Sequence, residues 1–511
     1  MKYHYLKTII VGALITGLLS CNSQPEFPND ATPTETSVEI YPDYKDITIP
    51  PNIAPLNFQI KLKGDAFAVS LEGKSGKLQS TAGKNGKFDF DSLEWRQLLE
   101  SNKGTDIKVT LYSQQTGRWQ QHPSYTLTVA NEPIDRYLSY RLIEPSYELY
   151  RQLGLYQRDL ENFTEKAIYE NNRSYDSENN HCVNCHNYQN YSTDRMLFHV
   201  RAKHGGSVFI EKGIARKLNM RCDSILSNTV YPTWHPTENW VVFSSNQTGQ
   251  AFHMVNHQKV EVIDYGSDLV FFDADQQTLT NIFRTKGSME TFPCWSPDGN
   301  RLFYCNAEFQ RLQETPDSTH SNLIIANYDS IYYNVMSVPF DISTRTFGVP
   351  RMEVNADSLK KSASVPRISP DGNYLLFTLG DYGQFHIWHK SADLYVKDLQ
   401  NQNVYALEDT NSHDAESYHT WSSNGRWIVF ASRREDGSYS RVHIAYFTSD
   451  GKGKKAFLLP QQDPEHNQLR LKSYNVPELT HNAVQISPEQ LKEVIYNDTD
   501  VKKVTYQSAF Q

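Results

Sequence analysis

A short turn recurs four times in the second half of this 511-residue chain. Its copies begin at Trp234, Trp295, Ile368 and Trp421, and an aromatic residue follows nine positions after each start, at Phe243, Tyr304, Phe377 and Phe430. The second and third copies read Ser-Pro-Asp-Gly-Asn after the first residue, which predicts a tight turn leading into a buried strand. The spacings of 61, 73 and 53 residues each leave room for one four-stranded sheet.

These turns resemble the WD40-like repeats of TolB-type β-propellers, and the resemblance covers about residues 181–480. A fainter fifth copy runs from Tyr191 to Arg195 and leads into Met196-Leu197-Phe198. The resemblance implies a propeller of about six blades, so one blade is either degenerate or closed by strands that the sequence does not identify.

The rest of the mature chain is expected to be mainly β. Residues 38–131 alternate apolar and polar side chains, as in Phe58-Ile60-Leu62 and Tyr125-Leu127-Val129, which predicts an immunoglobulin-like β-sandwich. Apolar residues from Leu149 to Ile168 approximate helical spacing, so residues 132–180 are expected to form a short helical connector. Residues 481–511 are expected to form a tail with one short helix from Ser487 to Val494.

The amino terminus has the pattern of an export signal. Lys2 and Lys7 precede an apolar run that ends in Leu18-Leu19-Ser20-Cys21, which resembles a bacterial lipobox. Residues 1–20 are therefore expected to be a lipoprotein signal peptide, Cys21 the lipidated residue and residues 21–37 a flexible tether. We expect a periplasm-facing outer-membrane lipoprotein; surface display and an ordinary signal peptide remain the alternatives.

The strongest chemical motif is Cys182-Val183-Asn184-Cys185-His186. This Cys-x-x-Cys-His spacing is the attachment pattern of c-type haem, in which two thiols bind the vinyl groups and the histidine is the proximal iron ligand. We therefore expect haem c on Cys182, Cys185 and His186. A disulfide between the two cysteines, free thiols or a structural metal site are the alternatives, and no second Cys-x-x-Cys supports zinc.

Three residues downstream of the motif are candidates for a distal haem ligand: Met196, His199 and His204. His199 and His204 are the preferred pair to test. A core role for Met196 and loop roles for the histidines are the competing interpretations.

The sequence favours two functions, which can coexist. The first is electron transfer or redox sensing with an unidentified redox partner; the second is a non-enzymatic envelope module that binds protein or glycan. A net charge of -9 disfavours nucleic acid as a partner. An enzyme is disfavoured because the chain has no Gly-x-Ser-x-Gly elbow. A metal-dependent lyase is the weakest alternative, and it would use scattered histidines: His386, His389, His413, His419 and His443.

Overall fold

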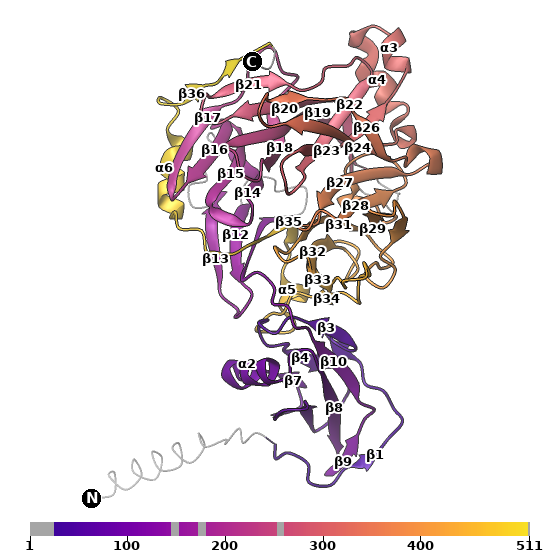
Figure 1. The fold of residues 1–511 in the computed structure, drawn as a ribbon. Helices are drawn as coiled ribbons and strands as arrows, with labels where there is room; N and C mark the ends of the chain where they lie inside the picture. The colour runs from indigo at the N-terminus through magenta and orange to yellow at the C-terminus, as the bar shows by residue number, and fades with distance from the viewer. Residues whose placement is uncertain (1–24, 145–152, 172–179, 253–259, 509–511) are drawn as a thin grey trace, which may run out of the picture.

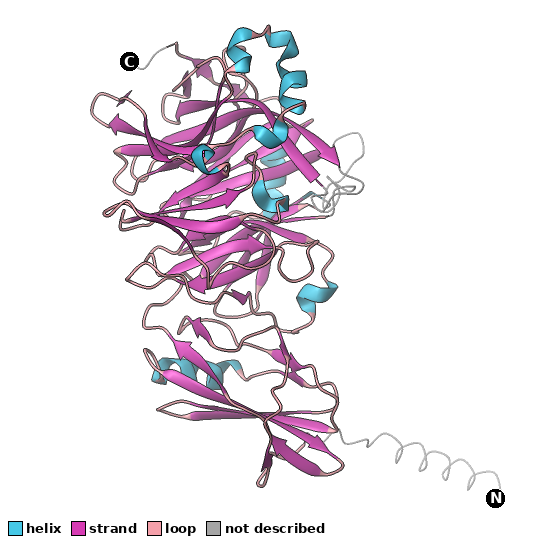
Figure 2. Ribbon diagram, turned by 90° about the vertical axis from the view of Figure 1, so that its right-hand side faces the viewer, coloured by secondary structure: helices cyan, strands magenta, loops and turns pink. Residues whose placement is uncertain are grey.

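The protein has two parts, a small β-sandwich and a larger ring of sheets (Figure 1; Figure 2). The structure is a computed structural model that describes residues 25–144, 153–171, 180–252 and 260–508. The expected signal peptide, Cys21 and the first residues of the tether lie outside these ranges. In the part of the chain that is described, no helix has the length and apolar character to cross a membrane.

The sandwich is formed by two sheets, one with the strand order β1-β9-β8-β10-β3 plus β5 and β6, the other with β2-β4-β7. One helix, α2 (Ser92–Ser101), buries Trp95 against them. The strands are β1 (Thr32–Pro33), β2 (Ile40–Tyr41), β3 (Ile47–Ile49), β4 (Phe58–Ile60), β5 (Ala66–Glu72), β6 (Lys77–Ala82), β7 (Lys87–Phe88), β8 (Asp106–Gln115), β9 (Arg118–Gln121) and β10 (Tyr125–Val129).

Six sheets form the ring, and each is one blade of a β-propeller. The first three blades are β14 (His181–Gln189), β15 (Ser192–Ala202), β16 (Gly206–Glu211) and β17 (Ile214–Asn219); β18 (Thr229–Trp234), β19 (Trp240–Phe252), β20 (Val260–Asp273) and β21 (Thr278–Asn281); and β22 (Ser288–Trp295), β23 (Arg301–Glu308), β24 (Asn334–Asp341), β25 (Thr346–Phe347) and β26 (Arg351–Val354). The others are β27 (Ser362–Ile368), β28 (Tyr374–Gly380), β29 (Asp393–Asp398) and β30 (Val404–Ala406); β31 (Glu416–Trp421), β32 (Trp427–Ser432), β33 (Arg441–Tyr446) and β34 (Phe457–Leu458); and β35 (Ser473–Thr480), β11 (Tyr137–Ile143), β12 (Gly154–Asp159) and β13 (Glu165–Glu170).

The sixth blade closes the ring with strands from both ends of the propeller. The innermost strands β14, β18, β22, β27, β31 and β35 contact one another in that order, and β35 also contacts β14. β35 pairs antiparallel with β11, so the last strand of the propeller completes a sheet begun by residues before the repeat. The prediction of a helical connector over residues 132–180 is therefore wrong for the described residues there, which form β11, β12 and β13. The expected mainly β fold with a propeller of about six blades is confirmed.

The repeated turn joins the innermost strand of a blade to its neighbour. In the copy after β22, Ser296 Oγ donates to Asp298 Oδ1 at 2.5 Å, Asn300 N donates to the same oxygen, and Gly299 has a φ of +71°. The turns after β27 and β31 repeat the serine contact, with Asp371 or Asn424 as acceptor. The Pro-Asp-Gly chemistry thus fixes the radial hairpins.

Every innermost strand also contains a β-bulge with one residue in the left-handed region. These residues have φ between +47° and +54° and are Cys185, Tyr231, Phe292, Val365, Tyr418 and Val476. At each of them the register with the second strand slips. The next residue is proline in four blades and histidine, His186 or His419, in the other two. A left-handed non-glycine residue is uncommon, and its repetition at one bulge per blade marks a feature of the architecture.

Helices and the tail cover the outside of the ring. Helices α3 (Arg311–Glu314) and α4 (His320–Ile325) lie between β23 and β24, and α5 (His466–Leu469) precedes β35. The expected tail helix is α6 (Pro488–Tyr496), with Ser487 and Gln490 in a capping box. After it, β36 (Lys502–Lys503) and β37 (Thr505–Tyr506) pair in parallel with the outer strands β17 and β21.

Candidate functional site

A cavity of about 390 Å³ lies at the centre of the propeller, and all six innermost strands contribute to its wall. The bulge residues Cys185, Tyr231, Phe292, Tyr418 and Val476 are among the residues that line it. The left-handed conformation places these positions at the cavity, so the bulge found in every blade also builds this site.

The two motif cysteines lie on β14 and line this cavity. Asn184 Nδ2 donates to Cys182 Sγ at 3.5 Å, and Cys185 Sγ donates to Asn184 Oδ1 at 3.5 Å, so both thiols flank one amide. Neither cysteine is in a disulfide. Burial raises the pKa of Cys182, while Arg141 and Arg201 act in the opposite direction.

His186 follows the bulge and is buried, with 4% of its surface exposed. Neither ring nitrogen has a hydrogen-bond partner among the described residues. Its Nε2 lies 3.8 Å from Oε2 of Glu478, which comes from β35. Burial lowers the pKa of His186 to about 3 and raises that of Glu478 to about 8, so both groups are neutral at pH 7. Glu478 Oε1 accepts hydrogen bonds from Asn187 Nδ2 and the Tyr188 amide.

The three candidate distal ligands are not brought to the cavity wall. Met196 is buried in the apolar core beside the first blade. His199 lies opposite Asn184 on β15, one strand outward, with Nδ1 3.5 Å from Ser207 Oγ. His204 contacts the tail, where its Nδ1 lies 2.8 Å from Oδ2 of Asp498. His199 is thus the candidate that pairs with a residue inside the motif, whereas Met196 pairs with Tyr188 further along β14.

The histidines considered for a lyase site do not converge on the cavity, and none of them lines it. His389 lies 3.1 Å from Glu261, His443 lies 3.3 Å from Glu435, and His419 contacts Thr378 and Leu376. Among the described residues no group of three or more histidine, cysteine or acidic side chains could hold a metal ion. The register sets Cys294 opposite Phe303 and Cys305 opposite Thr291, so these two thiols are not cross-strand partners.

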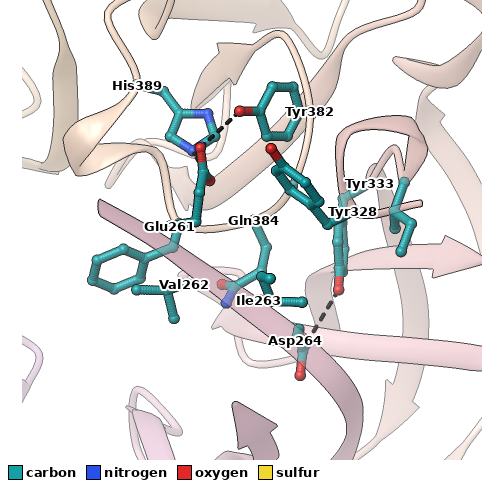
Figure 3. A pocket seen from close by; sticks show the side chains of 12 residues that line it. Glu261, Val262, Ile263, Asp264, Tyr328, Tyr333, Tyr382, Gln384 and His389 are labelled. Carbon is teal, nitrogen blue, oxygen red and sulfur yellow. Dashed lines mark hydrogen bonds and ion pairs between the residues drawn. The ribbon is translucent and has the colours of Figure 1, made fainter. Parts of the chain in front are cut away.

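A second, smaller cavity of about 20 Å³ adjoins the first, and Val262 and Phe385 line both (Figure 3). Glu261 accepts a hydrogen bond from Tyr382 and contacts His389, while Asp264 accepts one from Tyr333. The volume suits about one water molecule. Glu261 and Asp264 therefore have hydrogen-bond partners around this small cavity, next to the wall of the larger cavity.

Sequence analysis did not single out the other polar residues of the central cavity. Arg141, Arg201 and Arg367 line it, together with the hydroxyl-bearing Tyr231 and Tyr418. In two blades the sequence marks the bulge by a residue followed by proline, in Tyr231-Pro232 and Phe292-Pro293. In both, the proline lies two residues before the tryptophan of the turn. This signal is weak because His186 and His419 replace proline in two blades.

No protein-family model and no curated protein matches the sequence. Solved structures similar to it include TolB from Acinetobacter baumannii, with a TM-score of 0.42 and 12% identity over 73% of this chain and 78% of that chain. An oligogalacturonate lyase in complex with manganese has a TM-score of 0.35 and 11% identity over 63% and 74% of the two chains. A prolyl endopeptidase has a TM-score of 0.34 and 12% identity over 63% and 42%. These similarities concern the fold alone, so function is argued from the cavity.

Proposed function

We propose that this chain is a lipid-anchored envelope protein that carries one covalent c-type haem in the central cavity of its propeller, for electron transfer or redox sensing. The observation that carries the proposal is the placement of Cys182, Cys185 and His186. All three lie on one strand and line one cavity. Cys-x-x-Cys-His is the spacing used for covalent haem attachment.

The residues present fit such a group. Cys182 and Cys185 would each add S–H across a vinyl double bond, forming a C–S bond and placing the hydrogen on the other vinyl carbon. His186 would be the proximal ligand, with the carboxyl group of Glu478 3.8 Å from its Nε2. When bound, the haem iron supplies one-electron redox chemistry.

The surroundings of His186 support this assignment over a purely structural role. His419 occupies the same bulge position in the fifth blade, and its two ring nitrogens lie 3.3 Å from Thr378 Oγ1 and the Leu376 carbonyl. Both ring nitrogens of His186 lack such partners in the described chain. Buried polar atoms normally have partners, so an unpartnered imidazole beside two thiols is consistent with a ligand.

The export signal is consistent with the same proposal, because c-type haem is attached outside the bacterial cytoplasm. The anchor at Cys21 lies outside the described residues and is part of the proposal. The electron donor and acceptor are expected to be envelope proteins.

The test is the intact mass and visible spectrum of the mature protein from a host that matures c-type cytochromes. We expect a covalent haem increment and a Soret band that survives denaturation. Cys182→Ser and Cys185→Ser together should remove both signals, whereas Cys222→Ser, which changes a cysteine outside the motif, should retain them. A colourless wild-type protein from a host shown to mature another c-type cytochrome would exclude the haem.

The alternative is a non-enzymatic envelope module that binds a protein or glycan. The observation that favours it is the central cavity itself, which side chains leave open over about 390 Å³. A colourless protein that captures a defined envelope ligand, with capture lost on filling the cavity by Val476→Trp, would support this function.

A further inference from the structure

The central cavity has an unbalanced positive charge. Arg141, Arg201 and Arg367 line it, and Glu478 is the only acidic residue among the lining side chains. None of the three arginines forms an ion pair with a described carboxylate. Arg141 Nε is buried without a partner, and the hydrogen bond from Arg367 Nη1 goes to the adjacent Pro366 carbonyl.

Two buried arginines of this protein, Arg158 and Arg441, have acceptors within the chain. The Arg158 guanidinium donates to Gln461 and to the Pro460, Asp159 and Asn162 carbonyls. That of Arg441 donates to the Lys472, Asn467 and Arg470 carbonyls. Arg141 and Arg367 are half-buried and Arg201 is exposed, so the guanidinium groups of the three cavity arginines are accessible to an anion.

Two phenol groups also line the central cavity. Tyr231 and Tyr418 occupy bulge positions, and neither hydroxyl donates to a described residue. The charges of Arg141 and Arg201 act on both hydroxyls, lowering pKa values that burial raises. The two hydroxyls and the guanidinium groups of Arg141 and Arg201 thus line one cavity and interact electrostatically across it.

Arg201 lies on β15, the second strand of the first blade, and Arg141 lies on β11, the second strand of the neighbouring sixth blade. Arg201 lies directly opposite Cys182 in the register of β14 and β15, so the two side chains share a face. Arg367 lies on β27, across the ring from β14. The donors thus surround the cavity instead of forming one surface patch.

We infer that Arg141, Arg201 and Arg367, with the hydroxyls of Tyr231 and Tyr418, form a binding site for a ligand with two carboxylates. Guanidinium groups bind carboxylates through paired, charge-assisted hydrogen bonds, and phenol hydroxyls add neutral donors. The two carboxylates have two possible sources: the propionates of the proposed haem, or a free dicarboxylate. The inference rests on the arginines and stands whether or not the haem is attached.

The test uses the full mature chain from a host without cytochrome c maturation, kept reduced and at low ionic strength. It is titrated separately with hemin, with hemin dimethyl ester, whose propionates are uncharged, and with succinate. If propionates are the carboxylates, hemin should bind about tenfold or more tightly than the ester. Arg201→Gln and, separately, Arg141→Gln should abolish that ratio. Arg195→Gln, near the other end of β15 and paired with Glu211, should leave it unchanged.

Each outcome decides the inference. Equal binding of hemin and its ester, with succinate binding that Arg201→Gln removes, assigns the site to a free dicarboxylate. Succinate binding without hemin binding supports the site and counts against the haem. Equal binding of hemin and its ester without succinate binding, or ligand binding that neither arginine variant changes, overturns the site. That last result leaves covalent attachment, which the intact mass measures independently, unaffected.

Discussion

His186 and His419 occupy equivalent bulge positions but have different surroundings. His419 is held by two contacts within the chain, whereas the ring of His186 faces the cavity and Glu478 with no hydrogen bond. The cost of a buried polar group depends on whether its partner is present. Two histidines at one architectural position therefore have different roles.

This difference predicts the stability of two alanine variants in protein without haem. His419→Ala should lower the free energy of unfolding by about 2 kcal/mol, because it removes two contacts in the core and leaves their acceptors unpaired. His186→Ala should cost less, because it removes a side chain that makes no hydrogen bond. Urea unfolding of both variants measures this, and a larger loss for His186→Ala would contradict it.

Glu478 predicts a pH dependence. Burial raises the pKa of its carboxyl in the folded protein to about 8, above its usual value near 4.5 in the unfolded chain. The folded state therefore binds the proton more tightly, and its contribution to stability is largest below pH 4.5 and is lost as the pH rises to 8. Glu478→Gln keeps an oxygen for Asn187 and Tyr188 but does not titrate.

Between pH 6 and pH 8, wild type should lose about 2 kcal/mol of stability relative to Glu478→Gln. Urea unfolding at the two pH values measures this difference. The exposed Glu314→Gln serves as the control and should follow wild type. Parallel pH profiles for wild type and Glu478→Gln would refute the assigned role.

At the scale of elements, the sequence predicted the blades that carry the repeated turn and missed strands β11, β12 and β13 of the sixth blade. Each of the turns that begin at Trp234, Trp295, Ile368 and Trp421 contains, within a few residues, the hydrogen-bond acceptor and the glycine of a tight turn, or residues that replace them. Each turn can therefore be recognised from a short stretch of sequence. β12 is buried along its whole length, Gly154 to Asp159, and so shows no alternation of apolar and polar residues. Its apolar residues were consequently interpreted as helical.

The site was predictable only in part, for a related reason. Cys182, Cys185 and His186 form a contiguous motif. Arg141, Arg201 and Arg367 meet only because strands from different blades converge on the axis, and no local pattern encodes that convergence. The distal candidates were chosen by distance along the chain, which does not measure direction: Met196 faces the core and His204 faces the tail.

The capping box of α6 gives a prediction at this scale. Ser487 Oγ accepts from the Gln490 amide, and the Gln490 side chain accepts from the Ser487 amide. Ser487→Ala should lower stability by about 1 kcal/mol. Denaturant unfolding would test this, with Ser438→Ala in a surface turn as a control expected to change little. No loss in Ser487→Ala would mean that the tail contributes little to propeller stability.

At the scale of the whole molecule, the sandwich and the propeller share a core. One apolar cluster includes Ile47 and Leu127 of the sandwich together with Trp427 and Ile444 of the fifth blade. Trp427 Nε1 donates to the Glu132 carbonyl at 3.1 Å, and Ser423 binds Asp135 through its amide and hydroxyl. Figure 1 shows the sandwich against this side of the ring. The two parts are therefore expected to behave as one body.

This shared core predicts one cooperative transition in calorimetry for the mature protein. Trp427→Ala, which truncates a fully buried side chain at the junction, should cost about 3–5 kcal/mol and shift that transition as a whole. Tryptophan fluorescence and far-UV circular dichroism should give the same midpoint. Two separate transitions in wild type would show that the sandwich and the propeller unfold independently.

Closure by β35 also sets an order of events as the chain is exported. The cavity wall includes Val476 and Glu478, which emerge after β14 with both thiols. Until β35 pairs with β11, the sixth side of the cavity is open. A modifying enzyme or a bulky group therefore has access to Cys182 and Cys185 during a period whose length is set by the chain between β14 and β35. Attachment of the proposed haem would consequently be a matter of timing as well as of fit.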